Sequence, residues 1–503
     1  MRLESVPSAQ HQPAAPPALD TDEFRRIGRL AVDLVADYLA GIRDQPVVQP
    51  MTESGRRAVA QEEFPEHGAA PEELLTHFAR HVLPYPMGNG HPRFFGWVNS
   101  PPSHMGIIAE FLAAAQNPSC DVGDLASIHL ETAVTRWLAE LVGFPADTGG
   151  ILVSGGSAAT LTCLAAARQQ VAERLDWDLG RDGLQDPSRP RLRLYASAEV
   201  HSSLRKSVEL LGLGHSAVRT IAVDADRRLD PDDLDRAVRE DLANGDLPFC
   251  VVATAGTVNT GAVDRLDALA DLCARHGLWL HVDGAYGAAA ALLPELGEVY
   301  RGLERADSVS LDPHKWLSVP IETGCALVRD AALMRRTFSH VPPYLMTEQN
   351  VGIGGTLDYA EYGFQQTRGF RALKTWMTLQ HMGRDGLRTL VRRHLRLARR
   401  LAELVDAADD LRRMSASPLS VVCFRYVPPG DPYTAQDLDR INRRLVADVQ
   451  TDGRVFLTGT VLDGTYVLRA CVLHHSTTED DVTALVSVVR EIGRGIAGKA
   501  GQA

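Results

Sequence analysis

The spacing of hydrophobic residues predicts a helical arm near the start of the chain. Within residues 22–42 they recur at helical intervals, and 71–82 forms a second amphipathic stretch. Two such stretches predict helices with one apolar face each. Residues 1–20 are rich in proline and poor in aromatic residues, a composition typical of a disordered tail. Helices are also expected at 105–115 and 128–142.

Short β-rich runs alternate with helical stretches in the middle of the chain. This alternation predicts a mostly parallel sheet with helices on both faces, an α/β fold. Ligand sites on such sheets lie just beyond the carboxyl ends of the strands. The expected strands are 150–153, 193–196, 217–223, 250–253, 279–282, 308–311 and 325–328, and the helices between them are 158–175, 202–211, 231–244 and 266–276.

The last part of the chain has a different pattern. A long amphipathic helical stretch runs from about 360 to 405 and is followed by expected strands and a final helix from 478. This pattern predicts a smaller C-terminal α+β domain, with strands at 419–426, 454–457 and 466–472. The predicted organisation is therefore a tail (1–20), an N-terminal helical arm (21–104), a large domain (105–395) and a small domain (396–503).

The charge balance disfavours a nucleic-acid partner. The 503 residues include 52 Lys+Arg and 64 Asp+Glu, a formal net charge of −12, and an acidic protein is repelled by a phosphate backbone. The arginine-rich stretch 388–400 alternates with apolar residues at helical spacing. We interpret it as the solvent-exposed face of an amphipathic helix.

Cysteine usage and hydropathy point to a cytoplasmic protein. The seven cysteines are scattered without a CxxC pair, as expected of reduced thiols, and no metal site is predicted. No apolar run is long enough to cross a bilayer, and the N-terminus lacks a signal-peptide pattern, so no membrane association is expected.

A lysine and an aspartate follow two of the predicted strands. Lys315 lies in Ser-Leu-Asp-Pro-His-Lys-Trp (310–316), and Asp283 lies in His-Val-Asp-Gly-Ala-Tyr-Gly (281–287). A buried carboxylate needs a cationic partner. A pyridinium nitrogen is such a partner, while a lysine can hold the same heterocycle as a Schiff base. The Gly-Ala pair that ends in Ala285 lets a ring approach the backbone.

A glycine pair precedes the first helix of the sheet region. The sequence Val-Ser-Gly-Gly-Ser (153–157) places Gly156 and Ser157 where a strand turns into a helix, and backbone N–H groups there can bind phosphate. This segment matches neither a Walker loop nor the GxGxxG motif. Taken alone, the glycine pair is also consistent with close packing of the helix start and no phosphate site. His201, at another strand end, has a flat ring that can stack on a heterocycle, although a histidine there is more often structural.

With these motifs, the chain resembles the group II pyridoxal-phosphate (PLP) decarboxylases, a family that includes aromatic-L-amino-acid, histidine, glutamate and cysteine-sulfinate decarboxylases. The resemblance covers about residues 22–490 and is carried by HPRFFG, VHSS, HVDGAYG, PHKW and GFRALKTW. It implies PLP fold type I (aspartate-aminotransferase-like), a homodimer with shared active sites, and decarboxylation of an L-amino acid as a small-molecule substrate.

The resemblance also implies a role for individual residues. Lys315 forms the Schiff base with pyridoxal 5'-phosphate, Asp283 pairs with the ring nitrogen and His201 stacks on the ring. Tyr344 falls in a loop where the family tyrosine protonates the carbanion, although a packed aromatic residue is the alternative. The remaining cofactor-binding candidates are Gly156, Ser157, Thr257, Ala285, Asp312 and His314.

The substrate remains open between classes of amino acid. The candidate substrate-binding residues are Phe95, Trp97, Ser100 and Arg469, and the aromatic ones favour an aromatic amino acid. Acidic and diamino substrates stay possible, and Arg469 fits a structural ion pair equally well. Two positions depart from the animal enzymes: Asp312 replaces a common asparagine, and Val258 replaces a threonine of their GTT pattern.

Four other functions remain alternatives. Decarboxylation coupled to oxidative deamination would give an aldehyde, but Tyr344 and His201 together favour the amine. An aminotransferase would accumulate the pyridoxamine form of the cofactor, and a sulfur-removing lyase needs a loop cysteine that the sequence does not identify. A catalytically silent binding protein is disfavoured by the complete set of site residues.

Overall fold

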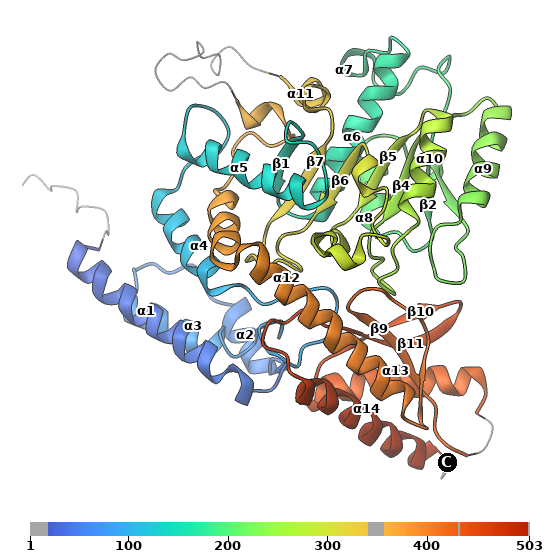
Figure 1. The fold of residues 1–503 in the computed structure, drawn as a ribbon. Coiled ribbons are helices and arrows are strands. Elements are labelled where there is room, and N and C mark those ends of the chain that lie inside the picture. Colours follow the sequence, from blue (N-terminus) through green and yellow to red (C-terminus); the bar gives the residue numbers. More distant parts are fainter. Residues whose placement is uncertain (1–18, 341–356, 431–432, 501–503) are drawn as a thin grey trace, which may run out of the picture. The chain divides into compact units, whose positions relative to one another are not determined.

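A computed structural model describes residues 19–340, 357–430 and 433–500 of the chain (Figure 1). The chain divides into two compact units, Met1–Met87 and Gly88–Ala503. Residues 1–18, most of the expected tail, lie outside the described residues. Within these, no helix is both long enough and apolar enough to cross a membrane.

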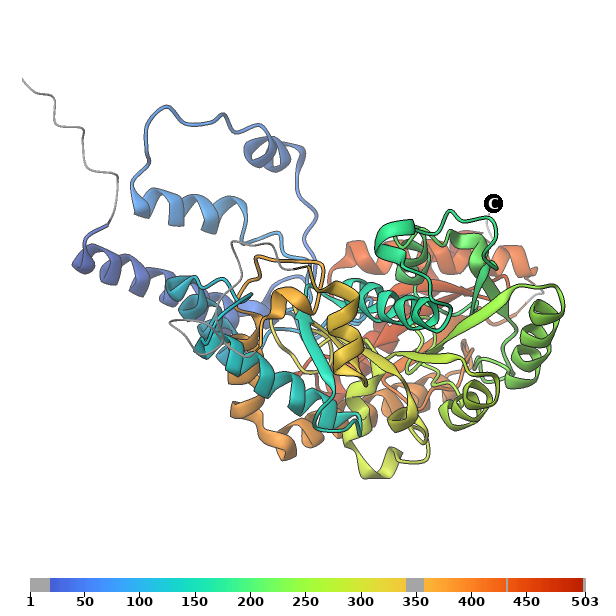
Figure 2. The same cartoon turned by 90° about the horizontal axis from the view of Figure 1, so that it is seen from above.

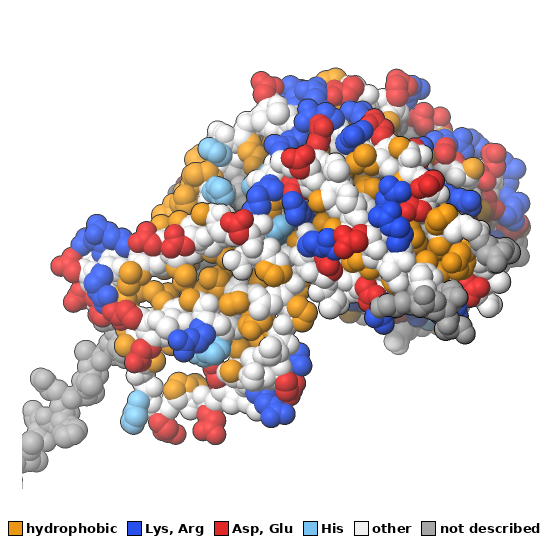
Figure 3. Space-filling view, turned by 90° about the horizontal axis from the view of Figure 1, so that it is seen from below, with side chains coloured by type: hydrophobic (Ala, Val, Ile, Leu, Met, Phe, Trp, Pro, Cys, Tyr) orange, Lys and Arg blue, Asp and Glu red, His pale blue; other side chains and the backbone are white. Residues whose placement is uncertain are grey.

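The N-terminal unit consists of helices that contact one another without burying any of their own residues. Its elements are α1 (Thr21–Gly41), η1 (Ile42–Asp44), α2 (Glu53–Ala60) and α3 (Pro71–His81). Asp20 caps α1 by accepting hydrogen bonds from the backbone N–H groups of Asp22 and Glu23. None of the residues of α1, α2 or α3 is buried, and hydrophobic side chains lie at the surface among the charged ones (Figure 3).

A seven-stranded sheet forms the centre of the second unit (Figures 1 and 2). The strand order is β1-β7-β6-β5-β4-β2-β3. Only β7 runs antiparallel to its neighbours, and the pairs β6–β5, β5–β4, β4–β2 and β2–β3 are parallel. The strands are β1 (Gly149–Val153), β2 (Leu192–Ser197), β3 (Val218–Ile221), β4 (Leu247–Thr254), β5 (Trp279–Asp283), β6 (Ser308–Leu311) and β7 (Gly324–Val328).

Alternate residues of each strand pack into two different hydrophobic clusters, one on each face of the sheet. In β1, for example, Ile151 and Val153 belong to one cluster and Leu152 to the other. The first face is covered by α6 (Gly156–Arg174), α8 (Ser203–Leu210) and α11 (Ala331–Phe338). The second is covered by α5 (Ala126–Leu141), α9 (Pro231–Ala243), α10 (Leu266–His276), η3 (Gly287–Leu292) and part of α12 (Arg371–Asp406). Because helices cover both faces of the sheet, most residues of its strands are apolar.

The C-terminal part forms a second sheet with its own hydrophobic cluster. Its order is β10-β11-β9-β8, and every pair is antiparallel. The end of α12 packs with this sheet and its two helices. The elements are β8 (Leu411–Arg413), β9 (Val421–Tyr426), α13 (Ala435–Asp452), β10 (Thr458–Leu462), β11 (Thr465–Cys471) and α14 (Glu479–Ala500).

The helix α4 (His104–Gln116) packs against α12. The remaining short elements are α7 (Leu179–Asp182), η2 (His215–Ala217), η4 (Pro294–Leu296), η5 (Leu303–Arg305) and η7 (Tyr359–Glu361).

The predicted α/β fold with a mostly parallel sheet is confirmed. Two local predictions differ from the structure. The long helix begins at Arg371 rather than near 360, and the strand expected at 454–457 is wrong, because only Phe456 pairs there, as an isolated bridge with Phe94, and β10 begins at Thr458. The domain boundaries expected at 104 and 395 stay predictions.

Candidate active site

A cavity of about 450 Å³ lies beyond the carboxyl ends of β1, β4, β5 and β6. Each strand contributes a polar residue at or just after its end: Ser154, Thr254, Asp283 and Asp312. Parallel strands bring these residues to one edge of the sheet, as expected for a ligand site in an α/β fold. The volume is in the range of small-molecule sites.

Lys315 lines this cavity. The sequence contains four lysines, at 206, 315, 374 and 499, and among the described lining residues Lys315 is the only one. Its Nζ lies 2.8 Å from Asp312 Oδ2. Burial lowers the pKa of Lys315, but the carboxylates of Asp312 and Asp283 outweigh it and raise the pKa above the usual value. The amine is therefore held as an ammonium by Asp312.

Asp283 ends β5, and its carboxylate is fixed in orientation. Oδ1 accepts hydrogen bonds from the backbone N–H of Ala285 at 3.1 Å and from the hydroxyl of Ser310 at 3.2 Å. The side chain lines the cavity although the residue is buried. A buried and oriented carboxylate of this kind is suited to hold a proton on a basic ring nitrogen.

The amino-terminal end of α6 borders the cavity through Gly155, Gly156 and Ser157. A Cβ added at Gly156 would lie 2.8 Å from Asp312 Oδ2 and 3.1 Å from the Ala285 Cβ, so the position requires glycine. The first N–H groups of a helix have no partner within the helix and favour an anion. This end of the cavity fits a phosphate group.

His314 and Asp312 lie beside that end. The Nδ1 of His314 lies 2.7 Å from the carbonyl oxygen of Thr323, which fixes the ring. Asp312 Oδ1 is buried and has no hydrogen-bond partner among the described residues. A buried carboxylate oxygen without a partner is costly, so this atom indicates that the cavity binds a polar group.

His201 lines the same cavity. Its Nδ1 lies 2.8 Å from the hydroxyl of Ser203, and it accepts a hydrogen bond from the Ser203 backbone N–H at 3.2 Å. Burial lowers the pKa of His201, an effect that the Asp283 carboxylate opposes only in part. The imidazole is therefore neutral at pH 7, which suits stacking on a cationic ring better than an imidazolium would.

Trp97 is the one predicted substrate-binding residue that lines the cavity among the described residues. Phe95 is fully buried in the C-terminal hydrophobic cluster, where its backbone N–H donates to the carbonyl of Phe456 at 2.7 Å. The hydroxyl of Ser100 donates to the carbonyl of His314 at 3.1 Å.

Arg469 is buried and does not line the cavity. It donates to the carbonyl oxygens of Asn259 at 3.1 Å and Trp97 at 2.9 Å, and its NH2 has no hydrogen-bond partner among the described residues. Its contact with a substrate carboxylate stays a prediction.

Thr257 is also not brought into the cavity. It is fully buried, and its hydroxyl lies 3.0 Å from that of Thr260. Tyr344 lies outside the described residues.

Several further lining residues are not among those predicted from the sequence, among them Asn99, Tyr286 and Glu322. Asn99 and Tyr286 sit close to Trp97 and Ala285 in the chain, and this closeness is the signal that could have found them. Tyr286 stacks on Trp316, the residue after Lys315, with ring centroids 5.0 Å apart. Glu322 also lines the cavity and has no signal in the sequence.

The donor set fits pyridoxal 5'-phosphate. One cavity combines an amine, a buried oriented carboxylate, a flat neutral imidazole and a helix terminus suited to phosphate. Gly155, Gly156 and Ala285 line the cavity with small residues. Fold and site together define a PLP-dependent enzyme of fold type I.

Comparison with known proteins identifies the family. A family model described as "Pyridoxal-dependent decarboxylase conserved domain" matches residues 54–427. The chain belongs to this family, and it is a PLP-dependent amino-acid decarboxylase.

Similar proteins match along nearly the whole chain. The aromatic-L-amino-acid decarboxylase of Bacillus atrophaeus is 32% identical over 476 residues, which are 94% of this chain and 96% of that protein. Tyrosine decarboxylase 1 of Narcissus pseudonarcissus is 30% identical, covering 94% and 93%. The crystal structure of Oryza sativa TDC with PLP and tryptamine has a TM-score of 0.88 at 28% identity and covers 96% of this chain and 100% of that one.

Proposed function

We propose that this enzyme decarboxylates an aromatic L-amino acid to its amine, with Lys315 as the residue that binds the cofactor covalently. The observation that carries the proposal is that Lys315, Asp283 and His201 line one cavity at the carboxyl edge of the sheet. No other lysine among the described lining residues competes for the role.

The residues of the cavity divide the binding of the cofactor between them. Gly156, Ser157 and the start of α6 would hold the phosphate, Asp283 would keep the ring nitrogen protonated, and His201 would lie against the ring face. When bound, pyridoxal phosphate supplies an electron sink for the bond between Cα and the substrate carboxylate. His314, fixed by Thr323, would orient the phosphate end.

The substrate end of the cavity is apolar and aromatic. Trp97, Val98 and Val258 line it, and apolar walls favour loss of a carboxylate by removing its water. An indole or phenol ring would pack against Trp97. Relatives named as aromatic-L-amino-acid, tyrosine and tryptophan decarboxylases support the aromatic class.

The product is proposed to be the amine because Tyr344 and His201 are both present. Tyr344 would deliver a proton to Cα after carbon dioxide leaves. The alternative outcome, an aldehyde, is favoured by two similar proteins, a phenylacetaldehyde synthase of Arabidopsis thaliana that is 29% identical and a 4-hydroxyphenylacetaldehyde synthase of Rhodiola rosea that is 26% identical.

A homodimer in the cytoplasm is also proposed. Hydrophobic side chains of α1 and α3 are exposed, including Leu30, Val32 and Leu74, and α4 separately exposes Ile108 and Leu112. Unpartnered apolar helix faces of this kind favour association with a second copy. All seven cysteines are free and buried, which agrees with a reducing compartment.

A panel of L-amino acids tests the proposal. Purified enzyme with added PLP is assayed for release of carbon dioxide from tyrosine, tryptophan, phenylalanine, glutamate and 2,4-diaminobutyrate, with amine, aldehyde and peroxide measured in the same reactions. We expect the aromatic substrates to give amine without peroxide. Preference for glutamate or diaminobutyrate would refute the substrate class, and aldehyde with peroxide would refute the product.

Lys315→Ala is the matched variant for this panel. It should release no carbon dioxide from any substrate, and retained turnover would refute the assignment of Lys315.

A further inference from the structure

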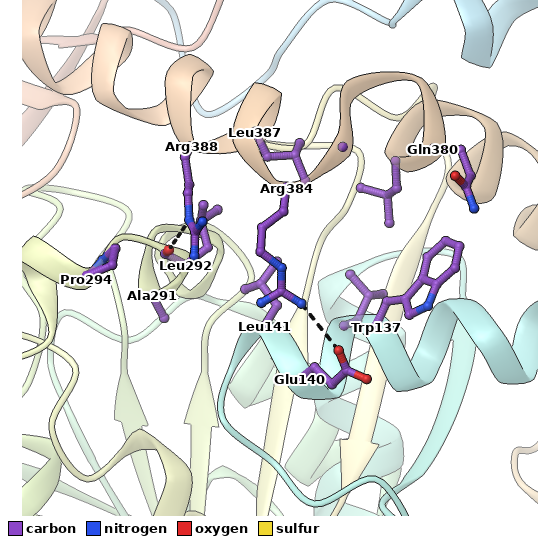
Figure 4. Close-up of a pocket in the computed structure, with 13 residues that line it drawn as sticks. Trp137, Glu140, Leu141, Ala291, Leu292, Pro294, Gln380, Arg384, Leu387 and Arg388 are labelled. Carbon is purple, nitrogen blue, oxygen red and sulfur yellow. Dashed lines mark hydrogen bonds and ion pairs between the residues drawn. The ribbon is translucent and has the colours of Figure 1, made fainter.

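A second cavity, of about 460 Å³, lies between α5, the segment 291–294 and α12 (Figure 4). It shares no lining residue with the active-site cavity. The second cavity therefore has no part in the proposed binding of the cofactor and substrate.

The cavity exists because α12 is interrupted. Gly383 has φ 61° and ψ 173°, a conformation outside the helical region and one that side-chain-bearing residues rarely adopt. The interruption separates Leu379 from Leu387, which lie on the two sides of it and both line the cavity. A Cβ at Gly383 would meet nothing within 4 Å, so backbone conformation rather than crowding requires the glycine.

The walls are apolar and include one indole ring. Trp137 and Leu141 come from α5, Leu292 from η3 and Leu387 from α12. Trp137, Leu141 and Leu292 are only half-buried. Such surfaces gain free energy when an apolar ligand covers them, and a flat ring can stack on the indole.

Two guanidinium groups and one carboxylate stand at the cavity. Arg384 reaches across towards Glu140, with NH2 3.3 Å from Oε2, and Arg388 donates through Nε to the carbonyl of Leu292 at 3.3 Å (Figure 4). The side chains of Arg384 and Glu140 are 62% and 44% exposed, so their ion pair is weak and easily replaced. Arg388 also pairs with Asp385 at 3.3 Å, but the Asp385 side chain is 97% exposed and does not line the cavity. Two guanidinium groups and one carboxylate therefore line the cavity, which favours an anionic group and disfavours an amine.

We propose that this cavity binds a small organic carboxylate with an aromatic body, held by Arg384 and Arg388 and covered by Trp137, Leu141 and Leu292. Arginine pairs with carboxylate in two parallel hydrogen bonds, which gives the site both affinity and orientation. The carboxylate can belong to an aryl acid or to a free aromatic amino acid, whose ammonium would then face Glu140.

The site is connected to the active site through two elements. Leu292 ends η3, a helix that begins four residues after Asp283. On α12, His394 accepts a hydrogen bond from Trp316 Nε1 at 2.9 Å, and Trp316 follows Lys315. A ligand that contacts both elements is therefore placed to affect turnover, and we expect it to change kcat when bound.

Calorimetric titration of the holoenzyme with indole-3-propionate tests the proposal. The double variant Arg384→Ala/Arg388→Ala should weaken binding about tenfold or more, the effect of losing hydrogen bonds to a charged group. Leu141→Trp, which fills the cavity, should weaken it as well. Arg392→Ala is the matched control, because Arg392 lies on the same helix, pairs with Glu295 and does not line the cavity, and it should bind as the unaltered protein does.

Lys315→Ala separates this site from the active site. It should retain binding of indole-3-propionate, whereas loss of binding in that variant would place the ligand in the catalytic cavity and overturn the proposal. Absence of saturable binding to the holoenzyme, or equal binding by the double variant, would overturn it too.

Two further probes identify the source of the carboxylate. In the Lys315→Ala background, L-tryptophan binding that falls when Arg384 and Arg388 are replaced supports an amino-acid ligand with Glu140 facing its ammonium, and binding that is unchanged supports a simple aryl acid. Tryptamine lacks the carboxylate, so the Arg384→Ala/Arg388→Ala variant should bind it as the unaltered protein does, and weaker tryptamine binding in that variant would refute the charge argument.

Discussion

Replacing Asp312 by asparagine tests the electrostatics around the proposed cofactor-binding lysine. The Asp312 carboxylate lies 2.8 Å from the Lys315 amine, and its side chain is almost fully buried. Burial lowers the pKa of Lys315, whereas Asp312 and Asp283 raise it, and the net pKa lies above the usual value. An opposite charge at this range favours the charged form of an amine, so Asp312→Asn should lower the pKa of Lys315.

The neutral amine is the form that reacts with an aldehyde. Below the pKa, each unit of decrease raises the neutral fraction about tenfold. Cofactor-free Asp312→Asn should therefore combine with pyridoxal phosphate faster at neutral pH, by about tenfold or more. The pH at which the rate stops rising should move to lower values as well.

Stopped-flow absorbance, recorded as the cofactor-free protein combines with pyridoxal phosphate across a range of pH, measures both quantities. Glu322→Gln is the matched control: Glu322 lines the same cavity but pairs with Arg371, so the net charge changes equally without loss of a contact to Lys315. An unchanged or higher inflection pH in Asp312→Asn would refute the reasoning. A faster reaction with pyridoxal phosphate at an unchanged inflection pH would show that Asp312→Asn affects binding of the phosphate group and not the pKa of Lys315.

Three further predictions concern the buried groups. Arg368→Met leaves Glu131 as a buried carboxylate without its ion-pair partner, since both side chains are only 1% exposed, and urea unfolding should show a free energy of unfolding lower by about 3–5 kcal/mol. Arg400→Met removes an exposed ion pair and should lower the free energy of unfolding by less than about 1 kcal/mol. Equal decreases in the two variants would contradict the account. Asp283→Asn should retain cofactor, seen by absorbance, while decarboxylation falls about a hundredfold or more; undiminished turnover would exclude its role. Burial raises the pKa of the Cys163 thiol to about 12. A thiol reagent at pH 8 should therefore leave Cys163 unmodified in the native protein and modify it after unfolding. Fast modification of Cys163 in the native protein would contradict its burial.

The parts of the fold that follow from local pattern were predictable from the sequence. Short apolar runs separated by amphipathic helices require a covered, mostly parallel sheet, and that topology brings the residues after the strands to one edge. The motifs that contain Lys315, Asp283 and Gly156 each follow a predicted strand, so the sequence is sufficient to assign these residues to one site.

Features that depend on distant contacts were not predictable in this way. Among the aromatic residues of HPRFFGW, the sequence does not tell which side chain faces the cavity. The pairing of Phe95 with Phe456, some 360 residues away, buries Phe95, and the positive φ of Trp97 turns that residue towards the cavity. The interruption of α12 at Gly383 could not be predicted from the sequence either, because a single glycine in an amphipathic pattern also fits an uninterrupted helix.

The central claim is that Lys315 carries the cofactor. Treating the purified enzyme and pyridoxal phosphate with borohydride converts a Schiff base into a stable amine, and mass spectrometry of the digested protein then locates the label. We predict the phosphopyridoxyl group on the peptide that contains Lys315, with none on Lys206, Lys374 or Lys499. Labelling of another lysine in place of Lys315, or no label in an enzyme that releases carbon dioxide, would contradict the account.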